Sequence, residues 1–289
     1  MSSSSTERVA AQIAILTTAL AAASKIGDTT RLIAEIRDRI EIVNTPEYSN
    51  FLNSVFPPLR ELLMRKTKEQ FEDTPENKIR HDILSILHKL PCNDVLKPHV
   101  YELMDLSLKI VEVDNEENAC VALNIISHLH KNYRPSLDNY AQAFLDLVIK
   151  MYENMHYTSQ TVLIISPVTA TGTVPLLRSM DSFKALEQCP IIVMLLFQTY
   201  AKFATKMLPK FLPLMVSTLQ LNPVTAAPMV MSNFTSLQRQ RYREFVAAQV
   251  KTLQVHPFTN STYVDMHPFL PPTCCCSSYF TFFGCHRKR

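Results

Sequence analysis

Two histidines at matching places in the chain are the first candidates for chemistry. His88 and His130 each precede a lysine in a helical segment, and an imidazole can transfer protons or bind a metal ion. Neither has a second metal-ligating side chain four residues away within its own helix, and His128 is two residues from His130, on another helical face. We interpret both as helix-end histidines close to free carbonyl groups.

A group of carboxylates is the second candidate. Asp114, Glu116 and Glu117 stand close together in the sequence, as acid–base catalysis or a calcium site would require. The same residues also suit the start of a helix, where a cap and negative charges complement the helix dipole. We interpret them as helix-start residues, because this role explains all three.

Basic residues gather in two places. Arg239, Arg241 and Arg243, followed by Lys251, could contact nucleic acid or acidic protein segments. A solvated helix face explains the same spacing, and we prefer that interpretation. A second group gets the same interpretation and consists of Arg65, Lys66 and Lys68.

The C-terminal segment from His256 onward differs from the rest of the chain. It contains three consecutive cysteines at 274–276 and a Cys285–His286 pair, which raises the alternatives of a zinc site and of palmitoylation. Adjacent cysteines do not present the spaced pairs that structural zinc sites use. We predict instead that this tail is disordered and lies outside the ancestral reading frame, as intron read-through or an alternative exon would.

Other catalytic signals are absent from the sequence. There is no glycine-rich phosphate loop, serine elbow or zinc-protease motif. The sequence therefore predicts no catalytic, cofactor-binding or metal-ligating residue, no cofactor and no small-molecule substrate. We expect that the chain is not an enzyme.

Composition indicates a helical globular protein. Of the 289 residues, 47% are hydrophobic and 19% are charged, and only three are glycine, which argues against glycine-rich nucleotide folds and strained strand corners. The net charge of +3 is too small to predict nucleic-acid binding by itself. No apolar run is long enough for a membrane helix, no secretory signal is visible, and the uneven cysteines predict a reducing compartment.

Apolar residues recur at helical spacing along most of the chain, and prolines mark helix starts. Thr45-Pro46 and Thr74-Pro75 each predict an N-cap followed by proline in the first turn. The second is followed by a one-sided apolar stripe of Ile79, Ile83, Ile86, Leu87 and Leu90. The predicted organisation is an N-terminal helix at 1–28, HEAT-like repeats at 29–155, a loop at 156–180, further HEAT-like helices at 181–255 with an interruption near Pro190, and the disordered tail at 256–289.

One segment recurs within the chain. Residues 83–89 (ILSILHK) align with 125–131 (IISHLHK) at an offset of 42, and Pro57 and Pro98 in the preceding helices are 41 apart. A helical pair that recurs every 40–47 residues is typical of HEAT and armadillo proteins, in which each hairpin buries its apolar face against the next. The sequence thus predicts an all-α, HEAT-like solenoid of antiparallel hairpins; an irregular helical bundle is the alternative.

Several segments resemble one known family. They include NTPEYSNFL at 44–52, VEVDNEEN at 111–118, HLHKNYRP at 128–135 and FVAAQVKTL at 245–253. They are similar to the N-terminal region of the TRRAP family (transformation/transcription domain-associated protein) and its fungal counterparts, over about residues 29–255. The acidic stretch at 115–118 (NEEN), followed by the ending His-Lys-x-Tyr/Phe-Arg-Pro at 130–135, is the most specific part.

The resemblance implies a function. Members of that family are very large HEAT-repeat proteins with FAT and pseudokinase domains, of the PIKK type, and serve as scaffolds in nuclear SAGA- and NuA4-type histone acetyltransferase complexes. By this likeness the chain would be the first few repeats: a non-catalytic, nuclear, chromatin-associated fragment that binds other coactivator subunits and acidic activators. It would bind no membrane and no nucleic acid directly. The alternative is an unrelated HEAT-type adaptor, such as a transport or phosphatase scaffold.

Overall fold

The described part of the chain is helical. The computed structural model describes residues 3–23, 25–65, 71, 74–134, 136–164, 176–221 and 236–266. Its helices are α1 (Ser3–Ala22), α2 (Ile26–Asp38), α3 (Tyr48–Met64), α4 (Pro75–His88), α5 (Val100–Val113), α6 (Glu116–Asn132), α7 (Asp138–Ile164), α8 (Phe183–Thr199), α9 (Ala201–Gln220) and α11 (Ser236–Met266), with short 3₁₀ turns at Ile40–Asn44, Lys97–His99 and Ser179–Asp181.

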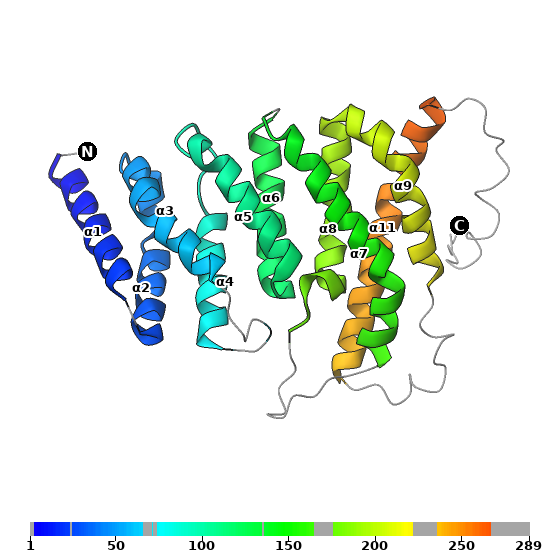
Figure 1. Ribbon diagram of the computed structural model, residues 1–289. Helices are drawn as coiled ribbons and strands as arrows, with labels where there is room; N and C mark the ends of the chain where they lie inside the picture. Colours follow the sequence, from blue (N-terminus) through cyan, green and yellow to red (C-terminus); the bar gives the residue numbers. More distant parts are fainter. Residues whose placement is uncertain are drawn as a thin grey trace, which may run out of the picture.

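The helices form two layers that run from one end of the molecule to the other (Figure 1). In one layer α2, α4, α6, α8 and α11 pack side by side in that order, and we call this the inner layer. In the other layer α1 packs on α3, and α5 and α9 both pack on α7. Edge-on packing of Phe56 against His99 and an ion pair between Arg60 and Glu102 join α3 to the α5 region. This arrangement confirms the predicted all-α, HEAT-like solenoid.

Side-chain caps begin three of the inner-layer helices. Thr74 accepts a hydrogen bond from the backbone N–H of Asn77 (3.3 Å), as predicted for α4. Asn115 accepts from the N–H groups of both Glu117 and Asn118 (3.0 Å each) at the start of α6. Ser182 accepts from Ala185 (3.3 Å) at the start of α8. Each cap satisfies a donor that the helix itself cannot pair.

The apolar stripes face the interior between the layers. The five stripe residues predicted for α4 are all buried, and so are Ile125 and Leu129 on α6, the counterparts of Ile83 and Leu87. Because α4 and α6 are neighbours in the inner layer, the repeated segments occupy equivalent places in adjacent repeats. The His88 ring stacks on the ring of His128 on α6, with centroids 4.9 Å apart, although the residue that aligns with His88 in the repeat is His130.

Several predicted helix starts and breaks were wrong. Thr45 is not the cap of α3, because its hydroxyl donates to Ile42 O (2.7 Å) in the preceding turn and the helix begins three residues later. Pro190 does not interrupt a helix, since α8 continues through it and the break falls at Tyr200. The predicted N-terminal boundary at residue 28 also lies inside α2.

The predicted loop and tail boundaries also need correction. The loop expected at 156–180 begins later, because α7 continues to Ile164, and it ends in the turn Ser179–Asp181. The helix expected to end near 255 continues to Met266. The remainder of the predicted tail, 267–289, and most of the predicted loop, 165–175, lie outside the described residues. Among the described helices, none combines the length and apolar character needed to cross a membrane.

The cap of α4 leads to a stability prediction. Thr74→Ala removes the acceptor for the Asn77 N–H and should lower the free energy of unfolding by about 1 kcal/mol, which corresponds to a fall in Tm of about 2–4 °C. Thermal denaturation followed by circular dichroism measures this. Thr74→Ser keeps the hydroxyl and is the control; equal losses in both variants would contradict the capping role.

Candidate functional site

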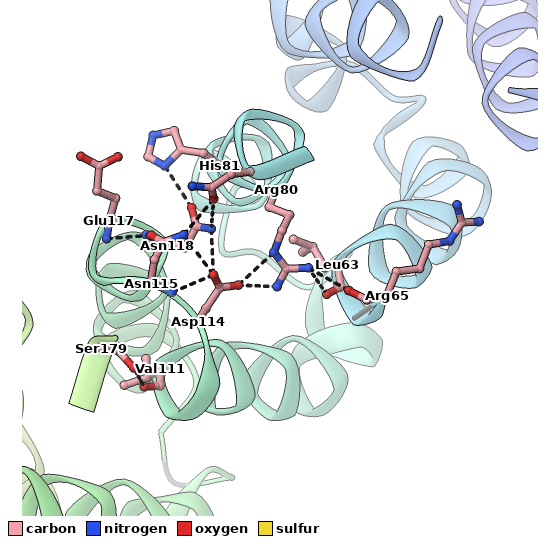
Figure 2. A network of polar contacts seen from close by, with 11 residues as sticks. Leu63, Arg65, Arg80, His81, Val111, Asp114, Asn115, Glu117, Asn118 and Ser179 are labelled. Carbon is pink, nitrogen blue, oxygen red and sulfur yellow. Dashed lines mark hydrogen bonds and ion pairs between the residues drawn. The ribbon is translucent and has the colours of Figure 1, made fainter. Parts of the chain in front are cut away.

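A buried ion pair joins three consecutive helices. Asp114, which links α5 to α6, is 0% exposed, and Arg80 on α4 is also buried. The guanidinium of Arg80 donates to Asp114 Oδ2 through Nε (3.0 Å) and through Nη2. Its Nη1 donates to the backbone carbonyls of Leu63 (2.6 Å) and Arg65 (3.3 Å) at the end of α3 (Figure 2). A single side chain therefore holds α3, α4 and the α5–α6 connection together.

Three asparagines surround the second oxygen of the same carboxylate. Asp114 Oδ1 accepts from the backbone N–H of Asn115 (2.8 Å) and from the side-chain amides of Asn115 and Asn118 (3.1 Å each). Asn77 Oδ1 on α4 accepts from the same two amides, at 2.8 and 3.2 Å. Figure 2 shows Asn115 and Asn118 beside Asp114, with Arg80 reaching the same carboxylate from α4. Both oxygens of the buried carboxylate are therefore hydrogen-bonded, as a buried charge requires.

A second buried ion pair connects α6 to α11, across the helix between them. Arg241 donates to Glu116 Oε1 (2.7 Å) and Oε2 (2.8 Å), in the two-pronged geometry that favours arginine. Ser182 at the start of α8 donates to Glu116 Oε2 (2.7 Å), and Glu244 accepts from Arg241 (2.9 Å). The starts of α6 and α8 and the body of α11 thus meet at one carboxylate.

The end of the predicted loop lies against this junction. The N–H of Glu116 donates to Leu177 O (2.8 Å), and the N–H of Ser179 donates to Asp114 O (3.0 Å). The Ser179 hydroxyl also donates to Val111 O (Figure 2). A stretch far away in sequence therefore satisfies backbone groups around the α5–α6 connection.

These contacts decide the role of the three candidate acids. Glu117 is exposed in the first turn of α6, as predicted. The interpretation of Asp114 and Glu116 as simple helix-start residues was incomplete, because each is buried in an ion pair with an arginine from another helix. Carboxylates whose oxygens are all hydrogen-bonded within the protein hold the segments that carry their partners in a fixed arrangement.

The predicted basic face on α11 is only partly solvated. Arg239 and Arg243 are exposed, but Arg241 is buried and paired, so its assignment to a solvent face was wrong. Of the other basic group, Arg65 is exposed beside Glu61 at 3.5 Å. Lys66 and Lys68 lie outside the described residues.

The histidines take separate roles. Burial lowers the pKa of His88, with smaller contributions from His128 and Lys89. His130 is fully buried, its Nδ1 is 3.5 Å from the Tyr200 hydroxyl, and its Nε2 makes no hydrogen bond with the described residues. Burial, and secondarily Arg134, lowers the pKa of His130 to about 4, so the imidazole is neutral near pH 7.

The cysteines among the described residues are free thiols that lie in or near the interior. Cys120 and Cys189 are buried and Cys92 is half-buried, and all three are free. Burial raises the pKa of Cys120 to about 12, which removes the thiolate that a nucleophile needs. The tail cysteines and His286 lie outside the described residues, and the described residues contain no group of three or more side chains placed to hold a metal ion.

The Arg80–Asp114 pair can be tested by removing one partner. Arg80→Met leaves the buried Asp114 carboxylate without its counter-charge, and we expect the free energy of unfolding to fall by about 3–5 kcal/mol. Urea denaturation measures the loss. The matched control is Arg60→Met, which breaks the exposed pair with Glu102 and should cost under about 1 kcal/mol. Equal effects of the two variants would contradict the assigned role.

The neutral His130 predicts a dependence of stability on pH. Its pKa of about 4 in the folded chain lies below the value of about 6.5 expected after unfolding. As the pH falls below about 6.5, the unfolded chain binds a proton that the folded chain does not, so stability decreases. Between pH 7 and pH 5 this amounts to about 2 kcal/mol.

Comparison with His130→Leu isolates this contribution. Urea denaturation at pH 7 and pH 5 should show a smaller loss in the variant, by about 2 kcal/mol. An identical loss in both proteins would show that His130 does not cause it.

Comparisons with known proteins identify relatives along most of the chain. No family model matches it. It is 35% identical to the probable transcription-associated protein 1 of Dictyostelium discoideum over 81% of this chain, and 25% identical to the human transformation/transcription domain-associated protein over 82%. It is 25% identical to the SAGA complex/NuA4 acetyltransferase complex subunit TRA1 of Saccharomyces cerevisiae over 76%. The chain spans only about 7% of the length of each of these relatives. With the helical-repeat fold, these likenesses show that the chain is a region of the TRRAP/Tra1 family.

Proposed function

We propose that this chain is a non-catalytic, protein-binding scaffold region of a transcription cofactor in SAGA- or NuA4-type histone acetyltransferase complexes. Two yeast relatives carry names that make them subunits of the SAGA and NuA4 complexes, and both align with about three quarters of this chain. Because the chain spans a small part of those proteins, the assignment concerns one segment of a scaffold. Such a scaffold acts in the nucleus, where its complexes modify chromatin.

The observation that supports this proposal most is that the buried charged groups are paired with one another inside the fold. The buried acids Asp114 and Glu116 and their arginine partners connect helices, and the buried His130 is neutral near pH 7. The two buried acids and their arginine partners therefore maintain the stacking of the repeats. What the stack offers outward is an extended surface over many helices, which suits contact with other proteins.

The partners are proteins of the coactivator complex together with acidic activators. Direct binding to nucleic acid is not part of the proposal. The net charge of +3 over 289 residues is small, and the buried Arg241 is taken up by Glu116 and Glu244 inside the fold. A strong phosphate-binding surface needs a denser set of free cations.

Affinity purification tests the proposal. The full chain with an epitope tag, expressed in cells, should co-purify with acetyltransferase-complex subunits from nuclear extract, and the eluate should acetylate histones. Arg80→Met is the control variant, since it breaks the junction that holds the repeats together and should lose the partners. Recovery with transport or phosphatase assemblies instead, or of the tagged chain without any acetyltransferase subunit, would contradict the assignment.

A further inference from the structure

Two imidazole rings from neighbouring repeats lie against each other. His88 is the last residue of α4, and His128 lies near the end of α6, the next helix of the inner layer. Their ring centroids are 4.9 Å apart, with an angle of 24° between the ring planes. Neither histidine has a second imidazole four residues away in its own helix, so the adjacent repeat provides the one that the sequence pattern lacks.

The ring nitrogens of this pair are free to bind a ligand. His88 is half-buried and His128 is exposed, and within the described residues the side chain of neither makes a hydrogen bond or an ion pair. His81, on the same helix as His88, differs because its Nδ1 lies 3.2 Å from Asn118 Oδ1. The pair thus presents unengaged nitrogen atoms from two helices at one place near the surface.

The protonation state of His88 suits metal binding. Burial lowers its pKa, and His128 and Lys89 lower it further, so the ring is neutral near pH 7. A neutral imidazole keeps the lone pair that a metal ion needs, and it binds the ion without first releasing a proton.

The separation of the two rings matches that of two imidazoles bound to one metal ion. A Zn–N bond is about 2.0–2.1 Å long, which places the ion roughly 3.2 Å from the centre of each ring. With N–metal–N angles from about 90° to about 109°, the ring centres then lie roughly 4.5–5.2 Å apart. The observed 4.9 Å falls within this range. Rotation about χ2, which is a broad torsion in histidine, turns a nitrogen of each ring toward the ion and leaves the ring centres in place.

We propose that His88 and His128 together bind one divalent transition-metal ion, such as Zn²⁺ or Cu²⁺, between α4 and α6, with water in the remaining positions. Imidazole is a preferred ligand of these ions. Because the protein supplies two ligands, the ion binds reversibly, unlike the ion in a four-ligand structural site. The bound ion joins the C-terminal ends of the two helices, which are the ends away from the Asp114 junction. This inference does not depend on the proposed scaffold function.

Calorimetric titration of the full chain with Zn²⁺ at pH 7 tests the proposal. Accessible thiols are alkylated beforehand, because cysteine thiolates also bind zinc. The wild type should bind one zinc ion that His88→Gln and His128→Gln each bind at least about tenfold more weakly. The reason is that the second ring binds at a high effective concentration once the first holds the ion, and either variant leaves a single imidazole.

His81→Gln is the matched control. His81 also lies on α4 and is partly exposed, but its ring is hydrogen-bonded to Asn118. Its replacement should leave the zinc affinity as in the wild type. Equal affinities in the wild type, His88→Gln and His128→Gln would overturn the proposal, and so would an equal loss of affinity in His81→Gln.

Thermal denaturation shows whether the ion joins the two repeats. Zinc at a hundredfold excess over its dissociation constant should raise the Tm of the wild type by roughly 5–10 °C, because only the folded chain holds the two rings together. His88→Gln and His128→Gln should each lose this rise, and His81→Gln should keep it. A wild-type Tm that zinc leaves unchanged, or a rise that persists in both single variants, would contradict a site shared by α4 and α6.

Discussion

The buried carboxylate of Asp114 constrains how α4, the α5–α6 connection and α6 are arranged. An ionised carboxylate away from water is costly unless both of its oxygens are engaged. Here Arg80 on α4 and the side-chain amides of Asn115 and Asn118 donate hydrogen bonds to the carboxylate. The same two amides also donate to the side-chain oxygen of Asn77. These partners are available together only when α4, the α5–α6 connection and α6 take one relative position. Apolar packing alone would allow neighbouring helices to slide past one another. Because the buried charge needs all of its partners, one relative position of the hairpins is favoured.

Arginine–carboxylate pairs recur across the inner layer. Arg37 on α2 reaches Asp82 on α4 at 2.7 Å, Arg80 reaches Asp114, and Arg241 reaches Glu116. The apolar stripes of successive helices are similar and could pack in more than one alignment. Each arginine–carboxylate pair fixes how its two helices are aligned, because the N–H donors of a guanidinium point in fixed directions. Apolar burial supplies most of the cohesion, and the ion pairs define which helix end meets which.

Local patterns in the sequence predicted the repeat and missed the ion pairs. The cap at Thr74, the apolar face of α4 and the offset of 42 residues between α4 and α6 depend on neighbours within a few positions, so the sequence shows them directly. The Glu116–Arg241 pair joins residues 125 positions apart. No short-range pattern connects them, and an arginine between two exposed arginines looks like part of a solvated face. Asp114 was misjudged for the same reason, since its partner Arg80 belongs to another helix.

Proline and threonine show a related limit of local patterns. Thr45-Pro46 and Thr74-Pro75 share the same two residue types, yet only Thr74 caps a helix, because the Thr45 hydroxyl bonds back to the preceding 3₁₀ turn. Pro190 was expected to interrupt its helix, but it is buried within α8. Tertiary packing of an apolar face can compensate for a helical hydrogen bond that proline removes. In both cases the outcome depends on what surrounds the residue.

The link between Glu116 and Arg241 has a consequence for how the molecule unfolds. In an ideal solenoid each repeat touches only its neighbours, so the terminal repeats can detach while the middle remains intact. Here α11 is tied to α6, with the start of α8 bound to the same carboxylate through Ser182. If α11 detached, the buried Glu116 carboxylate would lose its arginine partner in the middle of the stack. Partial opening from that end is therefore penalised, and the second half of the chain behaves as one cooperative unit instead of a series of independently fraying layers.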